Sequence, residues 1–361
     1  MARKKRTKSH GFGFKHLLDN RCPICCIVPP YMLEQMAVNG SPRQREWAFE
    51  TLNLSAQIRG RRFNLGNMQV TPQTSGKNRN IYDAKNLQEL PGEIVRSEGD
   101  AATEDEAVNE AYDAAGATYD FFKEVCDRNS IDDKGLRLDS TVHYGKDYEN
   151  AFWNGSQMVY GDGDGELFNR FTKSADVIGH ELTHGVTQYE ADLIYFGESG
   201  ALNESFSDVF GSLVKQRINN QTANEADWLI GVELFTEKVQ GEAIRSMKSP
   251  GTAYNDPVLG KDPQPAHMKD IYKGTKDNGG VHINSGIPNR AFYLAATEIG
   301  GYAWEKAGKI WYVTLCEKLD SKANIKQAAE ITIAVAQELY GESSSEQQAV
   351  NNAWKQVGVL Q

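Results

Sequence analysis

Two histidines and a glutamate within residues 176–188 have the residue types and the spacing of a metal site. His180 and His184 are four residues apart, so on a helix their imidazoles lie on one face, one turn apart. Two neutral imidazoles at this spacing can bind one Zn²⁺. Glu181 stands beside them, where a base could take a proton from a water molecule on the metal. The segment predicts part of a catalytic zinc site, and a helix with two unrelated histidines is the alternative.

A catalytic zinc ion has three protein ligands and one open position, so a third ligand must be found. Glu204 lies far enough beyond His184 for a loop and a second helix packed beside the first. Asp208 is one turn beyond Glu204 on the same helix face. Its carboxylate could accept the free ring N–H of a ligating histidine and so fix the tautomer. The alternative is an exposed acidic helix face.

The histidine pair needs a helix over residues 174–189 to hold it. Ser174 is placed to cap this helix, and the negative charge of Asp176 suits its positive N-terminal end. Apolar residues at helical spacing supply the packing face: Val177, Leu182 and Val186. The segment is therefore predicted to be a buried helix that presents both imidazoles to one side.

The pattern changes from mixed to helical along the chain. Strands are expected at 81–83, 92–97, 136–143 and 156–160, and a long helix over 104–128. Later helices are expected at 174–189, 201–218, 286–299, 302–319, 324–340 and 345–357. This order predicts an α+β protein with a mixed, β-rich N-terminal lobe and a mainly helical C-terminal lobe. The histidine helix would lie between the two lobes, a usual place for a cleft.

Three parts are expected along the chain. They are an N-terminal extension over 1–70, an N-terminal lobe with the histidine helix over 71–195, and a helical C-terminal lobe over 196–361. The extension should hold a short helix that begins at Pro29-Pro30 and a second helix from Pro42 to about Leu54. Residues 64–80 are polar and rich in turn formers, which predicts an exposed connector.

Charge and hydropathy exclude several classes of partner. The net charge is −10 and the isoelectric point is about 5.3, so nucleic acid is not an expected partner. No apolar run approaches the ~20 residues that a membrane-spanning helix needs. A basic stretch over residues 3–8 is followed by no apolar core, because Lys15, His16 and Asp19 interrupt the segment that follows. A classical secretory signal is therefore not recognised.

Three of the five cysteines cluster in the extension, at Cys22, Cys25 and Cys26. The odd number and uneven spacing do not indicate a disulfide framework. Cys22 and Cys25 have the spacing of a metal or redox pair, with His10 and His16 upstream. No second cysteine pair is present to complete a four-ligand site, so a structural zinc there is the less favoured hypothesis.

The two metal-binding segments together resemble the thermolysin family of zinc endopeptidases. His180-Glu181-x-x-His184 is followed by Asn203-Glu204-x-x-x-Asp208, as in that family. The resemblance covers nearly all of residues 75–361 and includes further separated motifs: Asn150-Ala151-Phe-Trp153-Asn-Gly, Tyr195 in Tyr-Phe-Gly-Glu-Ser-Gly, Arg245 in Ile-Arg-Ser-Met, and Asp277-Asn-Gly-Gly-Val-His282. The resemblance implies a two-lobed zincin fold.

The resemblance also implies a role for each matching residue. His180, His184 and Glu204 would bind one catalytic Zn²⁺, Asp208 would support a ligand, and Glu181 would be the base. His282 and Tyr195 would stabilise the oxyanion, and Asp277 would orient His282. Asn150 and the Ala151 backbone would bind the substrate as an added β-strand, and Arg245 would hold a substrate carbonyl. The family prefers bulky apolar residues just after the scissile bond.

Pro29-Pro30-Tyr31 and the short extension resemble the protealysin-type branch of the family, whose propeptide is brief. The resemblance implies a self-processed precursor whose own extension acts as an intramolecular inhibitor. Two ways of inhibition are open: a rigid apolar plug at Pro29–Tyr31, which the resemblance favours, or a cysteine thiolate in the open position of the zinc.

The chain departs from the family at the expected double calcium site. Asp176 and Asp227 match acidic ligands, but Lys215 replaces a glutamate, and Val232 occupies another expected acidic position next to Glu233. The loop expected to bind a further calcium after residue 231 is shortened. A lysine ammonium could hold the carboxylates together in place of Ca²⁺. Calcium is thus left open by the resemblance but disfavoured by Lys215.

Two other functions compete with the endopeptidase. A zinc exopeptidase would need a charged pocket for a chain terminus, and none is recognised. A non-catalytic metal-binding adhesion or scaffold module would need neither Glu181 nor His282, and both are present. A broad protease is hazardous inside its own cell, so secretion by a non-classical route is favoured, with a cytoplasmic precursor as the alternative. Peptides and proteins are the expected substrates.

Overall fold

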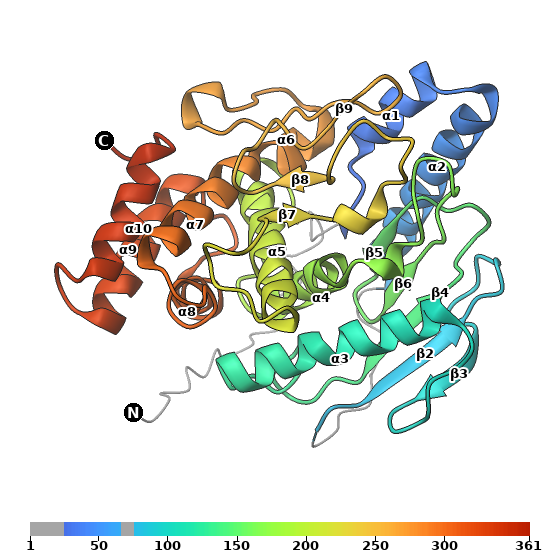
Figure 1. Cartoon of the computed structure of the whole chain (residues 1–361), viewed down its shortest axis with the longest axis horizontal. Coiled ribbons are helices and arrows are strands. Elements are labelled where there is room, and N and C mark those ends of the chain that lie inside the picture. Colours follow the sequence, from blue (N-terminus) through green and yellow to red (C-terminus); the bar gives the residue numbers. More distant parts are fainter. Residues whose placement is uncertain (1–24, 66–75) are drawn as a thin grey trace.

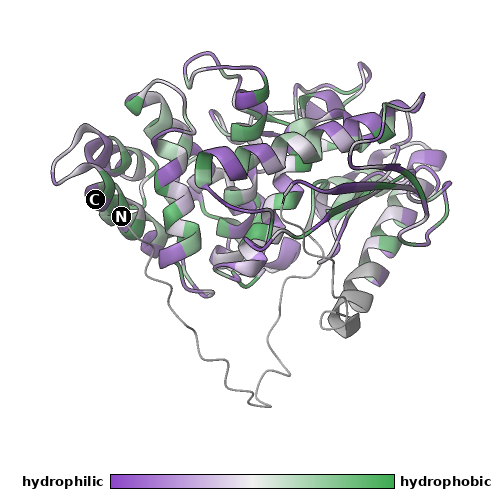
Figure 2. Ribbon diagram, turned by 90° about the horizontal axis from the view of Figure 1, so that it is seen from below, coloured by the Kyte–Doolittle hydropathy of each residue, from purple (hydrophilic) through white to green (hydrophobic). Residues whose placement is uncertain are grey.

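The computed structural model describes residues 25–65 and 76–361. Figure 1 shows strands and the long helix α3 (Glu106–Cys126) on one side, helices α4 (Ala175–Tyr189) and α5 (Gly197–Ile218) at the centre, and further helices at the C-terminal end. This order of elements is the predicted α+β arrangement, and Figure 2 shows helices whose hydrophobic and hydrophilic residues are interspersed along their length. Within the described ranges, no helix is both long and apolar enough to cross a membrane.

The N-terminal lobe is built on a six-stranded sheet with the order β1-β5-β6-β4-β2-β3. The strands are β1 (Cys25–Cys26), β5 (Ala151–Trp153), β6 (Met158–Tyr160), β4 (Leu138–Val142), β2 (Arg79–Asp83) and β3 (Glu93–Ser97). β2, β4 and β6 run parallel, while β3, β5 and β1 are antiparallel to their neighbours. Helix α3 (Glu106–Cys126) packs on β2 and β4 through its row of alanine and aromatic side chains. The sheet thus ends at an edge formed by the first described residues.

The C-terminal half is helical around a central pair of helices. They are α4 (Ala175–Tyr189) and α5 (Gly197–Ile218), and the helices around them are α6 (Lys276–Asn284), α7 (Gly286–Ile299), α8 (Ala307–Val313), α9 (Ile325–Tyr340) and α10 (Ser345–Gln356). The C-terminal half also contains two antiparallel pairs of short strands. β7 (Leu229–Ile230) pairs with β8 (Arg245–Ser246), and β9 (Asn255–Asp256) pairs with β10 (Gly260–Lys261).

Two glycines let α4 and α5 cross at close range. A Cβ atom on Gly179 would lie 3.1 Å from the Cα of Gly211, and one on Gly211 would lie 2.3 Å from the carbonyl oxygen of Asp176. Because real Cβ atoms do not approach a backbone oxygen this closely, only glycine allows the contact. The close crossing brings the histidines of α4 next to the carboxylates of α5.

Residues 25–65 of the extension fold as a strand and two helices against the rest of the chain. α1 (Pro30–Asn39) follows β1, and α2 (Pro42–Leu65) lies beside β5 and β6 in Figure 1. The side chains of Ile27, Val28 and Met32 are fully buried in the main hydrophobic core. The extension is therefore part of the folded molecule, and the burial of its apolar side chains is the main force that holds it there.

Several predicted boundaries are corrected. The second helix of the extension continues to Leu65 instead of ending near residue 54. The helix expected over 302–319 is the short α8 followed by a turn of π-helix, η4 (Thr314–Lys318). Ser174 precedes α4 but does not cap it, because its hydroxyl donates to the side chains of Asp176 and Glu233. Most of the connector, residues 66–75, lies outside the described residues.

Candidate metal centre

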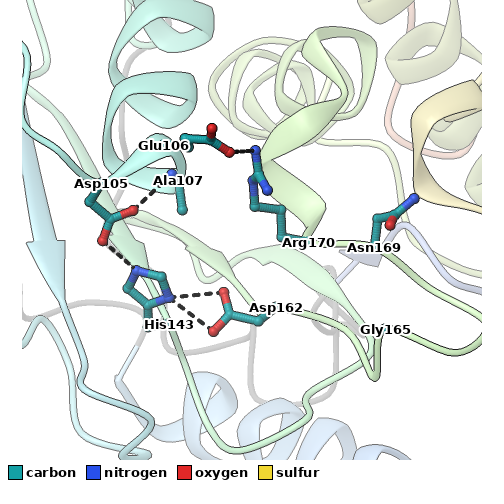
Figure 3. A pocket seen from close by; sticks show the side chains of 8 residues that line it. All are labelled: Asp105, Glu106, Ala107, His143, Asp162, Gly165, Asn169 and Arg170. Atoms are coloured by element: carbon teal, nitrogen blue, oxygen red, sulfur yellow. Dashed lines mark hydrogen bonds and ion pairs between the residues drawn. The ribbon is translucent and has the colours of Figure 1, made fainter. Parts of the chain in front are cut away.

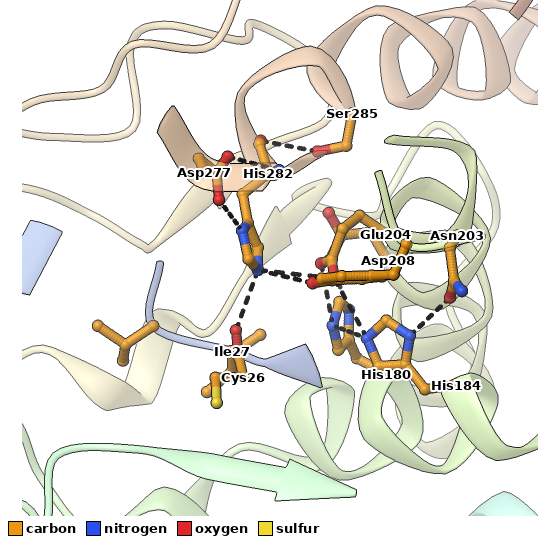
Figure 4. A network of polar contacts seen from close by, with 12 residues as sticks. Cys26, Ile27, His180, His184, Asn203, Glu204, Asp208, Asp277, His282 and Ser285 are labelled. Carbon is orange, nitrogen blue, oxygen red and sulfur yellow. Dashed lines mark hydrogen bonds and ion pairs between the residues drawn. The ribbon is translucent and has the colours of Figure 1, made fainter. Parts of the chain in front are cut away.

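The side chains of His180, His184 and Glu204 converge on one buried point between α4 and α5 (Figure 4). The two histidine Nε2 atoms are 3.0 Å apart, and each lies 3.5 Å from an oxygen of Glu204. Ligand atoms placed 2.0–2.1 Å from a tetrahedral zinc are about 3.3 Å from one another, so these separations fit Zn²⁺. Glu204 Oε2 is buried and has no hydrogen-bond partner among the described residues. The three residues form a possible zinc site.

Each histidine is oriented by a hydrogen bond at its other ring nitrogen. His180 Nδ1 lies 2.8 Å from Asp208 Oδ1, and His184 Nδ1 lies 2.8 Å from Asn203 Oδ1. Both contacts leave the Nε2 atoms facing Glu204, which is the orientation that a metal ligand requires. The sequence motif contains Asn203, but no role was predicted for it. Its position next to the ligand Glu204 was the signal that it could orient a histidine.

Charges around the centre keep Glu204 and Asp208 ionised. Burial alone would raise the pKa of Glu204, but the neighbouring histidines, His282 foremost among them, outweigh it and lower that pKa. Burial acts in the same sense on Asp208, and Arg245 outweighs it there, so the Asp208 pKa lies well below its usual range. The pKa of His184 falls to about 3 because of burial, which leaves a neutral imidazole ready to donate a lone pair.

Glu181 extends from α4 toward β5, the strand that pairs with β1 at the end of the sheet. Its Oε2 accepts the backbone N–H of Trp153 at 3.1 Å. The carboxylate is fully buried and belongs to the residue between the two histidines. Glu181 therefore lies between the edge of the sheet and the possible zinc site, without being one of the three converging residues.

Tyr195 and His282 lie together beside Glu204. The Tyr195 hydroxyl is 3.2 Å from His282 Nε2 and donates to Glu204. His282 Nδ1 lies 2.6 Å from Asp277 Oδ1. Burial would lower the pKa of His282, but the charges of Glu204 and Asp277 outweigh it and raise that pKa to about 9. A protonated His282 can donate from both ring nitrogens at neutral pH.

An unusual backbone turn positions His282. Residues 277–280 all have positive φ, between 50° and 83°, before the chain enters the helical turn that carries His282. The turn directs Asp277 back to the helix, where Oδ2 accepts the backbone N–H groups of His282 and Ile283. At Gly280 a Cβ atom would also lie 2.6 Å from the ring of Tyr272, so this position requires glycine twice over.

The extension occupies the edge of the sheet next to these residues. β1 pairs antiparallel with β5, and the N–H of Ile27 donates to the carbonyl of Ala151 at 3.3 Å. The side chain of Asn150 binds Val28 twice, accepting its N–H at 3.0 Å and donating to its carbonyl at 3.2 Å. The resemblance predicted that Asn150 and Ala151 bind a substrate strand, but nothing in the sequence indicated that residues 25–28 lie in its place.

Two more contacts fix the same segment from the helical lobe. Arg245 donates to the carbonyl of Ile27 at 3.1 Å, while its guanidinium also binds both oxygens of Asp208. His282 Nε2 lies 3.1 Å from the carbonyl oxygen of Cys26 (Figure 4). All the residues predicted to bind a substrate backbone thus contact residues 26–28 of the chain itself.

The side chain of Cys26 points away from the metal centre. It is buried in a small apolar cluster with Ala84, Tyr144, Tyr148, Phe152 and Val159. A thiolate of Cys26 as the fourth zinc ligand therefore does not fit this structure. The side chains of Cys22 and Cys25 lie outside the described part of the chain, as does the hypothetical cysteine–histidine zinc site that includes them.

Lys215 occupies the position where related proteins were expected to bind calcium. Its Nζ lies 3.0 Å from Asp176 Oδ2 and 2.9 Å from Asp227 Oδ1, and donates to the carbonyl of Leu229 at 2.6 Å. Burial would lower the pKa of Lys215, but Asp176 and Asp227 outweigh it and raise that pKa. The ammonium therefore stays charged between the carboxylates.

Comparison with known proteins identifies relatives over nearly the whole chain. The family model of the thermolysin metallopeptidase catalytic domain matches residues 44–188, and that of the alpha-helical domain matches residues 191–359. The chain is 52% identical to an extracellular metalloprotease of Pectobacterium carotovorum subsp. carotovorum, an alignment that covers 93% of this chain and 97% of that protein. It is 51% identical to protease PrtS of Photorhabdus sp. (strain Az29), over 92% of this chain and 91% of that protein.

Among solved structures, the precursor of protealysin, a metalloproteinase from Serratia proteamaculans, is similar with a TM-score of 0.86. The two sequences are 55% identical, and the match covers 93% of this chain and 100% of that chain. A thermolysin of Bacillus caldolyticus is 43% identical over 79% of this chain and 52% of its own length, so this chain spans about half of that relative.

Proposed function

The chain belongs to the thermolysin family of zinc metallopeptidases, in its protealysin-type branch, and on that premise we propose that it cleaves internal peptide bonds before bulky apolar residues and is made as a self-processed precursor. The extension over residues 1–70 is the intramolecular inhibitor in this proposal. The observation that carries it is the contact of residues 26–28 with the same groups that would bind a substrate backbone.

The chemistry follows from the arrangement of the side chains. His180, His184 and Glu204 would hold a zinc ion, which when bound would act as a Lewis acid toward water and the scissile carbonyl. Glu181 takes the proton of that water and passes it to the leaving amine. Glu181 can take this role because it lies next to the ligand His180 in the sequence and its carboxylate reaches β5, where it accepts the backbone N–H of Trp153.

The remaining residues bind and stabilise the substrate. His282 donates toward the carbonyl oxygen on which negative charge develops, and the Tyr195 hydroxyl, 3.2 Å from His282 Nε2, would turn from Glu204 to donate to the same oxygen. Asp277 keeps the His282 ring in this orientation. Asn150, the Ala151 carbonyl and Arg245 bind backbone groups rather than side chains, which explains how a protease can accept many sequences. A buried isoleucine at position 27 supports a preference for an apolar residue after the scissile bond.

We propose that the enzyme acts outside the cell after export by a non-classical route. The similarity to an extracellular metalloprotease supports an extracellular site of action. A precursor whose substrate-binding groups are already occupied would be harmless to the cytoplasm before export. Export of a Glu181→Gln precursor that cannot process itself tests this route, and retention of all of it inside the cell would contradict the proposal.

The metal mechanism is tested with two variants of the full chain. Glu181→Gln should bind a normal amount of zinc, because Glu181 is not a ligand, and should lose nearly all casein hydrolysis. Glu204→Ala should lose the zinc itself. Zinc content is measured by elemental analysis. Activity is measured as casein hydrolysis, with and without a chelator, after the wild type has trimmed itself.

Two results would refute the proposed mechanism. One is a Glu181→Gln variant with full zinc and wild-type turnover, and the other is full zinc occupancy in Glu204→Ala. The size of the casein fragments separates the alternatives, since an exopeptidase releases single residues or short terminal peptides, and a non-catalytic scaffold releases nothing.

A further inference from the structure

We propose that the peptide bond between Cys26 and Ile27 is a substrate bond of the enzyme's own active site, the first to be hydrolysed in the precursor, and that the nicked precursor remains latent. The inference rests on the proposed endopeptidase function and adds a cleavage site and an order of events to it. It follows from the register in which residues 25–28 lie on β5.

The contacts on the two sides of this bond are those of a bound substrate. On the amine side, Ile27 donates to the Ala151 carbonyl at 3.3 Å and accepts from Arg245 at 3.1 Å. On the acyl side, the carbonyl oxygen of Cys26 lies 3.1 Å from His282 Nε2. His282 Nε2 is also 3.5 Å from Glu204 Oε1, so the Cys26 carbonyl lies directly beside the possible zinc site.

Among the described residues that lie on β5, no other peptide bond has this combination of contacts. The next carbonyl along the chain, that of Ile27, binds Arg245, and the one after it, that of Val28, binds the Asn150 amide. Neither arginine nor asparagine belongs to the groups that would stabilise an oxyanion. The Cys26–Ile27 bond is therefore the one presented to Glu181 and His282.

The side chains on either side agree with this register. Ile27 is fully buried and bulky, as the residue after a scissile bond should be in the proposed specificity. Cys26 lies opposite Phe152 in the β1–β5 ladder with its thiol in the apolar cluster, away from the metal ligands. The carbonyl of Cys26, rather than its sulfur, is thus the group that faces the centre.

The proposed step is a simple hydrolysis. Water adds to the Cys26 carbonyl carbon, Glu181 accepts a proton from that water, and the C–N bond to Ile27 breaks. The proton passes to the leaving nitrogen, which yields a carboxylate on Cys26 and an amine on Ile27. No oxidant, reductant or further reactant is required.

The cut does not release the inhibitory part of the extension. Within the described residues, Val28 keeps both hydrogen bonds to Asn150, and α1 buries Met32, Leu33 and Met36 in the core. Helix α2 is joined to the catalytic lobe by Trp47 Nε1 to Asp147 at 3.2 Å and by the Ser55–Tyr148 hydroxyl pair at 3.1 Å. Residues 27–65 therefore still cover the substrate edge until the connector is cut.

The direct test is intact-mass spectrometry of the full-chain precursor, purified with a chelator and started by adding zinc. We expect a protein that begins at Ile27 and a peptide that ends at Cys26 to form before any species that begins in the connector. The fraction of precursor cut per unit time should not change on ten-fold dilution, because the bond is already bound in its own active site. Cutting of one molecule by another would instead slow by about ten-fold. Glu181→Gln should show no cut.

Variants at position 27 test the register. Ile27→Asp places a charge in a buried apolar site and should slow the 26–27 cut by at least about ten-fold. Ile27→Leu, of equal volume, is the matched control and should be cut at a rate close to that of wild type. The casein activity of the nicked species, assayed before the connector is cut, should be a small fraction of that of the fully trimmed enzyme.

The outcomes separate this inference from the proposed function. If the trimmed enzyme hydrolyses casein while the 26–27 bond stays intact, the inference is wrong and the endopeptidase stands. If neither casein nor the extension is ever cut, the proposed function fails as well. Full casein activity in the nicked species would overturn its latency, and a wild-type cutting rate in Ile27→Asp would overturn the register.

Discussion

Arg245 connects the substrate edge to the metal centre through a single side chain. Its guanidinium binds both oxygens of Asp208 and the carbonyl of Ile27, and Asp208 in turn holds His180 Nδ1. Because Arg245 and Asp208 are both fully buried, their charges depend on one another. When Arg245 binds a backbone carbonyl, it therefore also affects Asp208, the group that orients His180. The sequence alone does not show this connection.

His143 forms a second charged cluster, away from the metal centre. Its Nε2 lies 2.8 Å from Asp105, the N-cap of α3, and its Nδ1 lies 2.9 Å from Asp162 (Figure 3). The three side chains line a cavity of about 420 Å³ with Glu106 and Arg170. The hydrogen bond to Asp162, against the opposing effect of partial burial, raises the pKa of His143 to about 9.

We predict that this cluster makes folding stability dependent on pH. A histidine whose pKa is raised from 6.5 to about 9 by folding contributes stability that is complete below about pH 6.5 and is lost as pH rises through 9. Allowing for partial exposure, His143→Gln should cost about 1–2 kcal/mol at pH 6 and little at pH 10. Urea unfolding in a Glu181→Gln background, which prevents self-digestion, measures the difference.

Lys173→Gln is a suitable control for that measurement, because this exposed residue also loses one positive charge. It should change stability by a similar small amount at both pH values. A constant difference between wild type and His143→Gln from pH 6 to pH 10 would show that the ring does not titrate between the two carboxylates.

At the scale of elements, periodicity and spacing predicted the helices that carry the site but not the contacts between them. The i and i+4 histidines required one face of α4, and the prediction holds. The meeting of α4 with α5 depends on Gly179 and Gly211, whose role appears only when a Cβ atom is built at each. β1 has two residues, too few for any strand pattern, so its place beside β5 could not be predicted.

Local polar competition explains where a helix signal failed. Ser174 had the right type and position for an N-cap, yet its hydroxyl binds Asp176 and Glu233 instead of a backbone N–H. Glu233 belongs to a distant turn, and sequence alone does not show that it lies there. The roles of Tyr195, Arg245 and His282 came from family resemblance, because each is a lone polar residue without an informative spacing.

Lys215 links α4, α5 and the loop at residue 227, and we predict that it makes calcium unnecessary. Its ammonium already lies 3.0 Å from Asp176 and 2.9 Å from Asp227. The melting temperature of the wild type should therefore change little with a calcium-selective chelator, while Lys215→Glu should become dependent on calcium because three carboxylates would then meet at one place. Thermal unfolding is followed with zinc held constant, since loss of zinc also destabilises the fold.

Lys238→Glu is the matched control, because it makes the same change of charge at an exposed position. It should leave the melting temperature independent of calcium. A large fall in the wild-type melting temperature on removing calcium would contradict the substitution of lysine for the metal ion.

At the scale of the whole molecule, the extension shares one core with the catalytic lobes. Ile27, Val28 and Met32 belong to the same buried cluster as Trp153 on β5 and Val177 on α4. A segment that shares the core cannot separate as a rigid body without exposing apolar surface on both sides, so its removal by stepwise proteolysis is favoured over simple dissociation. The polar connector is the place where the last cut would free it.

The last prediction distinguishes an apolar plug from a cysteine switch. Pro29 and Pro30 fix the backbone at the start of α1, and Tyr31 packs against the main core. Pro29→Gly with Pro30→Gly and Tyr31→Ala should loosen residues 26–28 and hasten activation, because the backbone gains freedom and the core loses a contact.

Replacing Cys22, Cys25 and Cys26 by serine should leave the precursor latent. Wild type should trim itself to a start near residues 65–78, and the Glu181→Gln precursor should stay full length. Casein hydrolysis measures latency and intact mass measures trimming, and both are followed from the moment zinc is added. Immediate activity of the triple-serine precursor, before any trimming, would show that a thiolate and not the plug keeps the enzyme latent.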